Sequence, residues 1–150
     1  MRVVIQRVSS ASVTIEGEIK ASIGVGFLVL LGIETEDMRE DAEWLCGKVA
    51  SLRVFGDENG LMNKSISEID GNIIVVSQFT LHASYKKGNR PSFLNAAKPE
   101  IALPLYEYFL ESLSSKVLKP VQSGIFGADM KVSLVNDGPV TIIMDTKNKE

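Results

Sequence analysis

A continuous run of β-branched side chains at residues 73–76 (Ile-Ile-Val-Val) constrains the fold of this chain more than any other segment. Four such residues without polar alternation are typical of a strand that is buried on both faces. The run ends abruptly at Ser77, Gln78 and Thr80. Polar side chains at the end of a buried strand need hydrogen-bond partners, and a bound ligand can be one of them. The sequence therefore predicts a central strand whose carboxyl end carries a candidate binding site.

A basic loop follows this strand end. Residues 85–91 read Tyr-Lys-Lys-Gly-Asn-Arg-Pro, and the side chains of Lys86, Lys87 and Arg90 could hold an anion. Lysines that only solvate a loop are also common, so the residues alone leave both interpretations open.

The remaining patterns predict an α+β fold in a single domain, residues 1–150, with a largely antiparallel mixed sheet that closes toward a barrel beside two main helices. Strands are expected at 2–15 (bent near residues 9–10), 18–23, 27–31, 52–55, 121–123, 130–135 and 140–144. Glu16-Gly17 and Asp70-Gly71 are typical hairpin turns. Residues 136–139 (Asn-Asp-Gly-Pro) indicate a tight turn between the last two strands, and residues 146–150 a frayed tail.

Two helices are expected from periodicity and capping signals. Asp37 and Glu40 have the spacing of an N-cap and N3 pair. They precede an apolar face formed by Ala42, Leu45, Cys46 and Val49. The second helix is predicted to start near Leu103, which places Pro104 in the first turn. Its apolar stripe is Leu105, Tyr108, Phe109 and Leu113.

Composition limits the cellular setting and the kind of partner. A net charge of −3 and a pI near 5.3 argue against broad, non-specific nucleic-acid binding, so any RNA contact should be local. The single cysteine cannot form an internal disulfide, no leader opens the chain, and no apolar run is long enough to cross a bilayer. We therefore expect a cytoplasmic protein that does not enter membranes.

The side-chain inventory is poor in catalytic groups. With one histidine and one cysteine, no His- or Cys-rich metal site is expected, and neither a phosphate-binding loop nor a dinucleotide fingerprint implies a cofactor. His82 as a general base has no orienting carboxylate close in sequence, so a surface or loop histidine is the plainer interpretation. Thr80 as a nucleophile lacks a recognisable base. Cys46 is expected in the core.

Four segments resemble one family. Residues 77–81 (SQFTL) and 136–141 (NDGPVT) match the two signatures of the D-aminoacyl-tRNA deacylases, and residues 1–8 and 87–93 are also similar to that family. The resemblance runs from the first residue to about Asp145. It implies hydrolysis of the ester that joins a D-amino acid, and also misattached glycine, to the 3′ end of tRNA.

The resemblance also implies roles for the site residues. Ser77, Gln78, Phe79 and Thr80 would form a positioning and oxyanion wall, whose backbone donors are worth roughly 3 kcal/mol each. The 2′-hydroxyl of the RNA would assist the attacking water. Thr80 as a covalent nucleophile remains an alternative.

In this family, selectivity for D- over L-aminoacyl-tRNA comes from a second element. Gly138-Pro139 resembles a rigid cis dipeptide that enters the pocket of the partner in a homodimer, holds the substrate amino group and excludes an L side chain. Arg7 would brace this element, with a surface ion pair as the alternative interpretation. Phe126 and Met130 would line the pocket, with core packing as an equal alternative. Lys86, Lys87 and Arg90 would contact tRNA.

Two other functions stay open. One is a relative with relaxed selectivity toward an L-aminoacyl-tRNA. The other is a non-catalytic module that binds the tRNA end without turnover and without regard to chirality.

Overall fold

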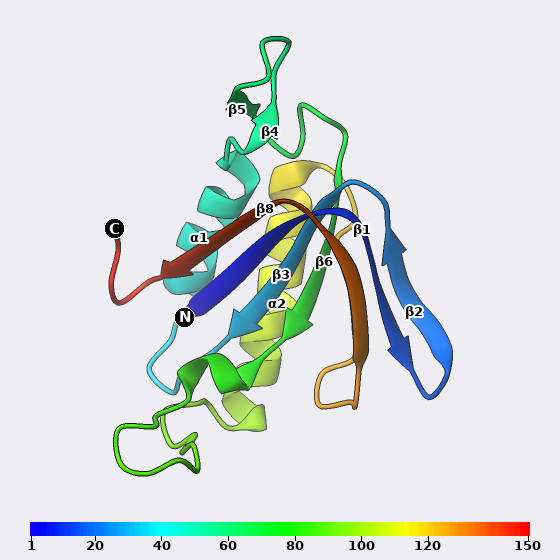
Figure 1. Ribbon diagram of the computed structural model, residues 1–150. Helices are drawn as coiled ribbons and strands as arrows, with labels where there is room; N and C mark the ends of the chain where they lie inside the picture. The colour runs from blue at the N-terminus through cyan, green and yellow to red at the C-terminus, as the bar shows by residue number, and fades with distance from the viewer.

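The computed structural model describes all 150 residues and is organised around one curved sheet (Figure 1). The strand order is β2-β1-β3-β6-β7, and β8 pairs with the free side of β1. The strands of this sheet are β1 (Arg2–Ile15), β2 (Glu18–Ile23), β3 (Gly26–Gly32), β6 (Asn72–Ser77), β7 (Gln122–Ser123) and β8 (Lys131–Asp145). A separate hairpin joins β4 (Phe55–Gly56) to β5 (Met62–Lys64). The helices are α1 (Arg39–Ser51), the 3₁₀ turn η1 (Phe79–His82) and α2 (Pro99–Val117).

The predicted fold class is confirmed. Strand β6 is parallel to β3 and β7, whereas β1 is antiparallel to β2, β3 and β8. Strand β1 bends so that its first half pairs with β3 and its second half with β2, and β8 follows it along its length. The sheet thereby curls over itself toward a barrel. Neither helix is long and apolar enough to cross a membrane.

The central strand is buried on both faces, as its sequence predicts. Ile73 and Val75 pack in the larger core with α1 and α2, whereas Ile74 and Val76 pack in a second core enclosed by the curled half of the sheet. All four side chains are at most 2% exposed. Burying each contributes about 1.5–3 kcal/mol, so this strand is a rigid base for the residues that follow it.

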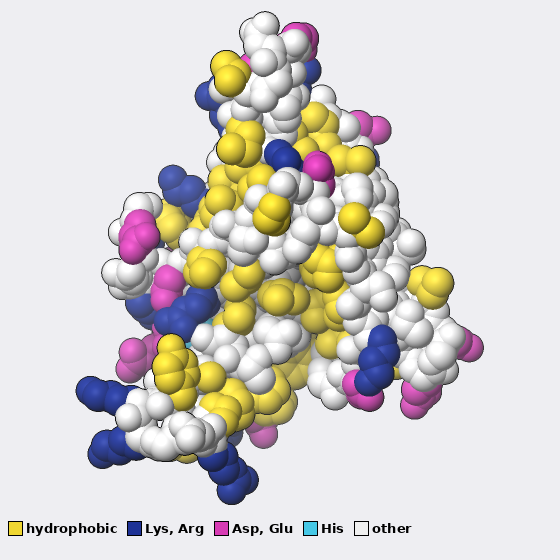
Figure 2. All heavy atoms as spheres, viewed as in Figure 1, with side chains coloured by type: hydrophobic (Ala, Val, Ile, Leu, Met, Phe, Trp, Pro, Cys, Tyr) yellow, Lys and Arg dark blue, Asp and Glu magenta, His cyan; other side chains and the backbone are white.

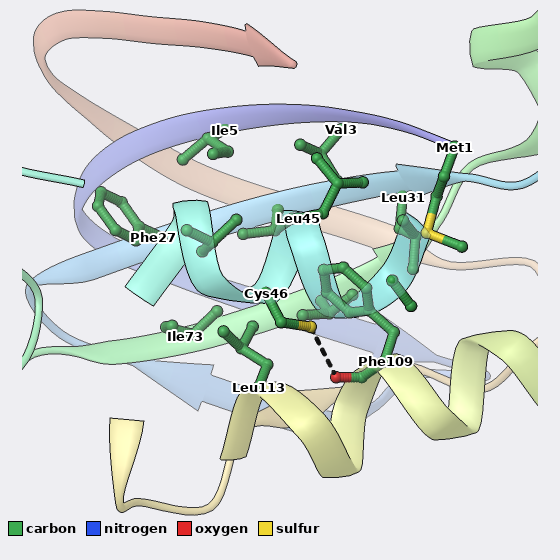
Figure 3. Packing of buried hydrophobic residues seen from close by; sticks show 14 of the residues in the cluster. Met1, Val3, Ile5, Phe27, Leu31, Leu45, Cys46, Ile73, Phe109 and Leu113 are labelled. Atoms are coloured by element: carbon green, nitrogen blue, oxygen red, sulfur yellow. Dashed lines mark hydrogen bonds between the residues drawn. The ribbon is translucent and has the colours of Figure 1, made fainter. Parts of the chain in front are cut away.

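Helix α1 presents the predicted face, with Ala42, Leu45, Cys46 and Val49 fully buried. Figure 3 shows Cys46 between the helices, where its thiol donates to the carbonyl of Phe109 at 3.4 Å. Burial raises the pKa of this thiol to about 12. Cys46 is therefore a core residue, as predicted.

The predicted cap of α1 is wrong by one residue. The N-cap is Met38, whose backbone N–H donates to Asp41 at 2.9 Å. Asp37 is buried instead, because its carboxylate accepts from the Met1 ammonium and from the backbone N–H of Glu34. The same ammonium donates to the hydroxyl of buried Thr146 at 2.8 Å, so the predicted frayed tail is anchored at its first residue.

The predicted start of α2 near Leu103 is also wrong. Pro99 occupies the first turn, and Pro104 lies inside the helix on its exposed side, where the carbonyl that loses a partner can bind water. The predicted stripe is half right. The buried residues are Ala102, Tyr106, Phe109 and Leu113, whereas Leu105 and Tyr108 are only half-buried.

Two turn predictions need correction. Asp70 has a positive φ of 52° and does turn the chain into β6, but β6 pairs in parallel with β3, so no hairpin forms. The tight turn expected at residues 136–139 is a bulge within the single strand β8. Asn136 pairs with Val8 and Thr141 with Gln6, so residues 137–140 all lie opposite Arg7.

Candidate functional site

The carboxyl end of β6 passes directly into η1. The backbone N–H of Gln78 donates to Leu31 of β3 at 2.7 Å, and the chain then closes a 3₁₀ turn through bonds from Leu81 to Gln78 (3.2 Å) and from Ala83 to Thr80 (3.1 Å). The strand thus ends at Ser77, and residues 79–82 do not continue it.

Gly32 at the end of β3 makes this docking possible. A Cβ atom added at Gly32 would lie 2.9 Å from the Cβ of Leu81 and 3.0 Å from the carbonyl oxygen of Gln78. Only a residue without a side chain lets η1 approach β3 so closely. The backbone of residues 78–82 is therefore held against the end of the sheet.

A cavity of about 590 Å³ opens beside this strand end. Its wall includes five of the predicted site residues, which are Ser77, Gln78, Phe79, Phe126 and Met130. Eleven of its seventeen lining residues are hydrophobic, and the size is typical of small-molecule sites. The cavity suits an acyl group with an apolar side chain.

Thr80 lies at the edge of the cavity and does not line it. Its hydroxyl accepts a hydrogen bond from the side-chain amide of Gln78. Phe79 and Thr80 are both exposed, and they open a 3₁₀ turn, where the first backbone N–H groups have no acceptor within the turn. This strand end can thus present backbone donors to a bound group.

The cavity contains no side chain suited to act as a buried acid or base. Lys98 and Asp129 are its only ionisable lining residues, and both are exposed. Tyr106 lies behind Phe126 with 5.7 Å between ring centroids, and burial raises its pKa to about 12, so the phenol stays neutral. No group of three or more His, Cys, Asp or Glu side chains is arranged to hold a metal ion.

His82 is buried, so the surface position expected from the sequence is wrong. Its Nδ1 atom lies 3.9 Å from a carboxylate oxygen of Glu34, and its Nε2 atom has no hydrogen-bond partner. The chain brings this carboxylate close in space although it is distant in sequence. His82 does not line the cavity.

The bulge that contains Gly138 and Pro139 is exposed and lies far from the cavity of the same chain. Ser77 is level with Val3 on β1, whereas the bulge faces Arg7, four residues further along. At about 3.3 Å per residue and 4.8 Å per strand, the separation is roughly 20 Å. Figure 1 shows β8 bending at the opposite end of the sheet from η1.

Arg7 holds this bulge in place. Its guanidinium donates to the carbonyl of Asp137 at 3.0 Å and to the carbonyl of Val54 at 2.5 Å. Gly138 has a φ of +129°, a conformation that favours glycine, and the Gly138-Pro139 peptide bond is cis. Arg7 and the bulge thus lie together in the fold.

The basic loop lies beside the cavity without lining it. Ser84 and Ser92 close its base through two backbone hydrogen bonds of 2.8 Å, and Lys86, Lys87 and Arg90 are exposed beyond this pair. Phe93 follows the loop and contacts Phe79 edge to face, with ring centroids 5.1 Å apart.

The opposite wall of the cavity is missed by the sequence analysis. It consists of residues 96–99 and Ala102, at the start of α2. Pro99 fits the first position of a helix and could have indicated this wall, but the predicted start of α2 near Leu103 left residues 96–102 outside the helix.

Two curated relatives, from Bacteroides fragilis (strain YCH46; 66% identical) and Phocaeicola vulgatus (67% identical), are named D-aminoacyl-tRNA deacylase, and each match covers 100% of both chains. A family model described as D-Tyr-tRNA(Tyr) deacylase matches residues 4–145. The chain belongs to this family.

Solved structures agree on the fold. A structure described as "c-Myc DNA Unwinding Element Binding Protein" is 44% identical, with a TM-score of 0.92 over 97% of this chain and 99% of that chain. A second, described as "a probable eukaryotic D-amino acid tRNA deacylase", is 17% identical with a TM-score of 0.82 over 95% and 97%. At 17% identity, the second comparison shows only that the two proteins share a fold.

Proposed function

We propose that this protein hydrolyses the ester bond that joins a D-amino acid to the 3′ end of tRNA and releases free amino acid and tRNA. The observation that carries the proposal is a full-length match to deacylases, combined with an apolar cavity at the end of β6. Because tRNA is the proposed substrate, we propose that the protein acts in the cytoplasm.

The mechanism relies on positioned backbone and not on a reactive side chain. An aminoacyl ester is an activated acyl group beside a vicinal hydroxyl, so hydrolysis needs a held carbonyl, a water molecule and donors for the oxyanion. In our proposal, the N–H groups of Phe79 and Thr80 supply the donors, each worth roughly 3 kcal/mol. Ser77 and Gln78 fix the wall, and the 2′-hydroxyl of the RNA helps to orient the water. The absence of a buried acid or base from the cavity wall supports this assignment.

The selectivity element acts in trans in this proposal. Gly138 and Pro139 are exposed and about 20 Å from the cavity of their own chain, so they can reach a cavity only in a second copy. Inserted there, the bulge would bind the substrate amino group through backbone carbonyls and occupy the volume that an L side chain requires. Glycine has no side chain to exclude and would be hydrolysed as well.

A homodimer is therefore part of the proposal. Strand β8 pairs only with β1, which leaves its other edge free. The large side chains of Leu134, Val135 and Ile143 on this strand are 37–68% exposed on either side of the bulge. A free strand edge flanked by exposed apolar side chains is typical of a protein interface.

The test is a comparison of D-alanyl-tRNA, L-alanyl-tRNA and glycyl-tRNA as substrates of the purified protein. The proposal predicts rapid release of D-alanine and glycine and negligible release of L-alanine. A folded dimer that leaves D-alanyl-tRNA intact would refute the proposal. Equal cleavage of both alanyl esters would instead indicate an enzyme without a chiral filter.

A further inference from the structure

The largest exposed apolar side chains near the cavity gather around the basic loop. Phe79, Tyr85 and Leu94 are 54%, 78% and 92% exposed. Apolar groups that cluster at such exposure beside a binding cavity mark an interaction surface. We refer to Phe79, Tyr85, Phe93 and Leu94 as the apolar shelf.

The shelf is continuous with the cavity. Phe79 and Phe93 both line the cavity and contact each other edge to face. Tyr85 and Phe93 each adjoin the hydrogen-bonded pair Ser84–Ser92, which fixes the base of the loop. A ligand that leaves the cavity past Phe79 and Phe93 can therefore reach the loop that bears Tyr85 and Leu94.

The segment that carries the shelf has charged side chains of one sign only, whereas the carboxylates of Asp129 and Glu34 approach it from other segments. Residues 71–99 contain no Asp or Glu, whereas residues 83–99 carry Lys86, Lys87, Arg90 and Lys98. None of these four cations takes part in an ion pair with a carboxylate of the chain. Figure 2 shows Lys and Arg side chains projecting around hydrophobic ones at the lower left, where this loop lies in Figure 1. In a chain of net charge −3, this is a local anion-binding surface.

Exposed aromatic rings combined with unpaired cations fit a single-stranded nucleic acid. Its bases stack on aromatic and apolar side chains, and its phosphates contact Lys and Arg. From this surface we infer that the shelf stacks the unpaired nucleotides that precede the terminal adenosine of tRNA, while Lys86, Lys87 and Arg90 hold their phosphates. The inference rests on the proposed function, because it assumes that the aminoacyl group occupies the cavity.

Such recognition depends little on base sequence, since every base has a face that can stack. It also explains how an acidic protein can bind tRNA through a small area. A short D-aminoacylated oligonucleotide that retains the unpaired end should therefore be hydrolysed nearly as well as D-aminoacyl-tRNA. D-alanyl-adenosine, which lacks the preceding nucleotides, should have a lower kcat/KM.

The test compares Tyr85→Ala and Leu94→Ala with the wild type on D-alanyl-tRNA and on D-alanyl-adenosine. Stacking on an aromatic ring is worth about 1–3 kcal/mol per base, so Tyr85→Ala should lower kcat/KM for the tRNA ester by about 5- to 150-fold. Leu94→Ala removes apolar contact but no ring, so it should lower the same value by a smaller factor. The value for D-alanyl-adenosine should not change. Leu118→Ala is the matched control, because Leu118 is 91% exposed at the far end of α2 and should leave both values unchanged.

Three outcomes would overturn the inference. Wild-type activity of both shelf variants on both substrates would show that the shelf binds no nucleotide. An equal loss on both substrates would place the effect in the cavity. A wild-type kcat/KM for D-alanyl-adenosine as high as for D-alanyl-tRNA would leave no role for the preceding nucleotides. Failure of the proposed function is distinguishable, because the wild type would then hydrolyse neither ester.

Discussion

Replacing Arg7 should both destabilise the fold and weaken chiral discrimination, because this residue joins the bulge to the rest of the protein. Its side chain is only 15% exposed and donates to the carbonyls of Asp137 and Val54. Hydrogen bonds from a charged donor contribute about 1.5–3 kcal/mol each and are not additive. We expect Arg7→Met to lower the free energy of unfolding by about 2–4 kcal/mol. Arg7→Lys retains the charge but cannot span both carbonyls, and it should recover no more than half of that loss.

The assay has two parts. Urea unfolding can be followed through the fluorescence of Trp44, the only tryptophan. With a slope near 2 kcal/mol/M, the Arg7→Met midpoint should fall by about 1–2 M. The kcat/KM ratio for D- over L-alanyl-tRNA should fall at least tenfold, because the released bulge no longer excludes the L side chain. A destabilised variant with unchanged discrimination would refute the bracing role, and an unchanged midpoint would refute the energetic argument.

Three further predictions concern separate parts of the molecule. Thr80→Ala should retain much of the wild-type kcat, because the oxyanion donors are backbone groups; complete loss in a folded variant that still binds substrate would favour a covalent nucleophile. Pro139→Ala removes the exposed ring proposed to fill the space of an L side chain, so L-alanyl-tRNA hydrolysis should rise while D-alanyl-tRNA hydrolysis persists; unchanged stereoselectivity would contradict the proposed filter. Burial raises the pKa of the Cys46 thiol from 9.0 to about 12. Above pH 9 the thiol therefore ionises in the unfolded chain but not in the folded one, and the free energy of unfolding should fall by about 1.4 kcal/mol between neutral pH and pH 10. Urea unfolding of Cys46→Ala should show an alkaline loss smaller by that amount, and an identical pH profile would exclude Cys46 as its source.

Sequence patterns correctly predicted the elements whose structure depends on residues close in sequence. The run at residues 73–76 is typical of a doubly buried strand, and the four-residue face of α1 repeats at the helical period. Predictions failed where a contact with a residue distant in sequence determines the local structure. Asp37 has a good capping position, but the ammonium of Met1 takes its carboxylate. Tyr106 is buried in place of Tyr108 because its hydroxyl reaches the carbonyl of Val75 at 3.0 Å.

The candidate site shows the same division. The end of β6 is a local feature, so Ser77 and Gln78 could be predicted to lie at a binding site. Thr80 was predicted with them but does not line the cavity, and Phe79 was indicated only by the family resemblance. The wall from residues 96–99 depends on where α2 packs, which its two prolines left ambiguous. That residues 137–140 form a bulge opposite Arg7, and not a turn, follows only from the pairing of β8 with β1. No local pattern could indicate whether the proposed filter acts within one chain or between two copies.

Mixed dimers test most directly the claim that the bulge of one subunit filters substrates in the cavity of the other. One subunit would carry Ala96→Trp, which fills the cavity, and the other Pro139→Ala, which damages the filter. Different tags on the two subunits allow the mixed dimer to be isolated. Its only open cavity belongs to the Pro139→Ala subunit. If the filter acts across the dimer, this cavity receives the intact bulge of the Ala96→Trp subunit. The account predicts that this species hydrolyses D-alanyl-tRNA and rejects L-alanyl-tRNA as the wild type does, although Pro139→Ala homodimers accept both and Ala96→Trp homodimers are inactive. Hydrolysis of L-alanyl-tRNA by the mixed dimer would place cavity and filter in the same chain and contradict the account.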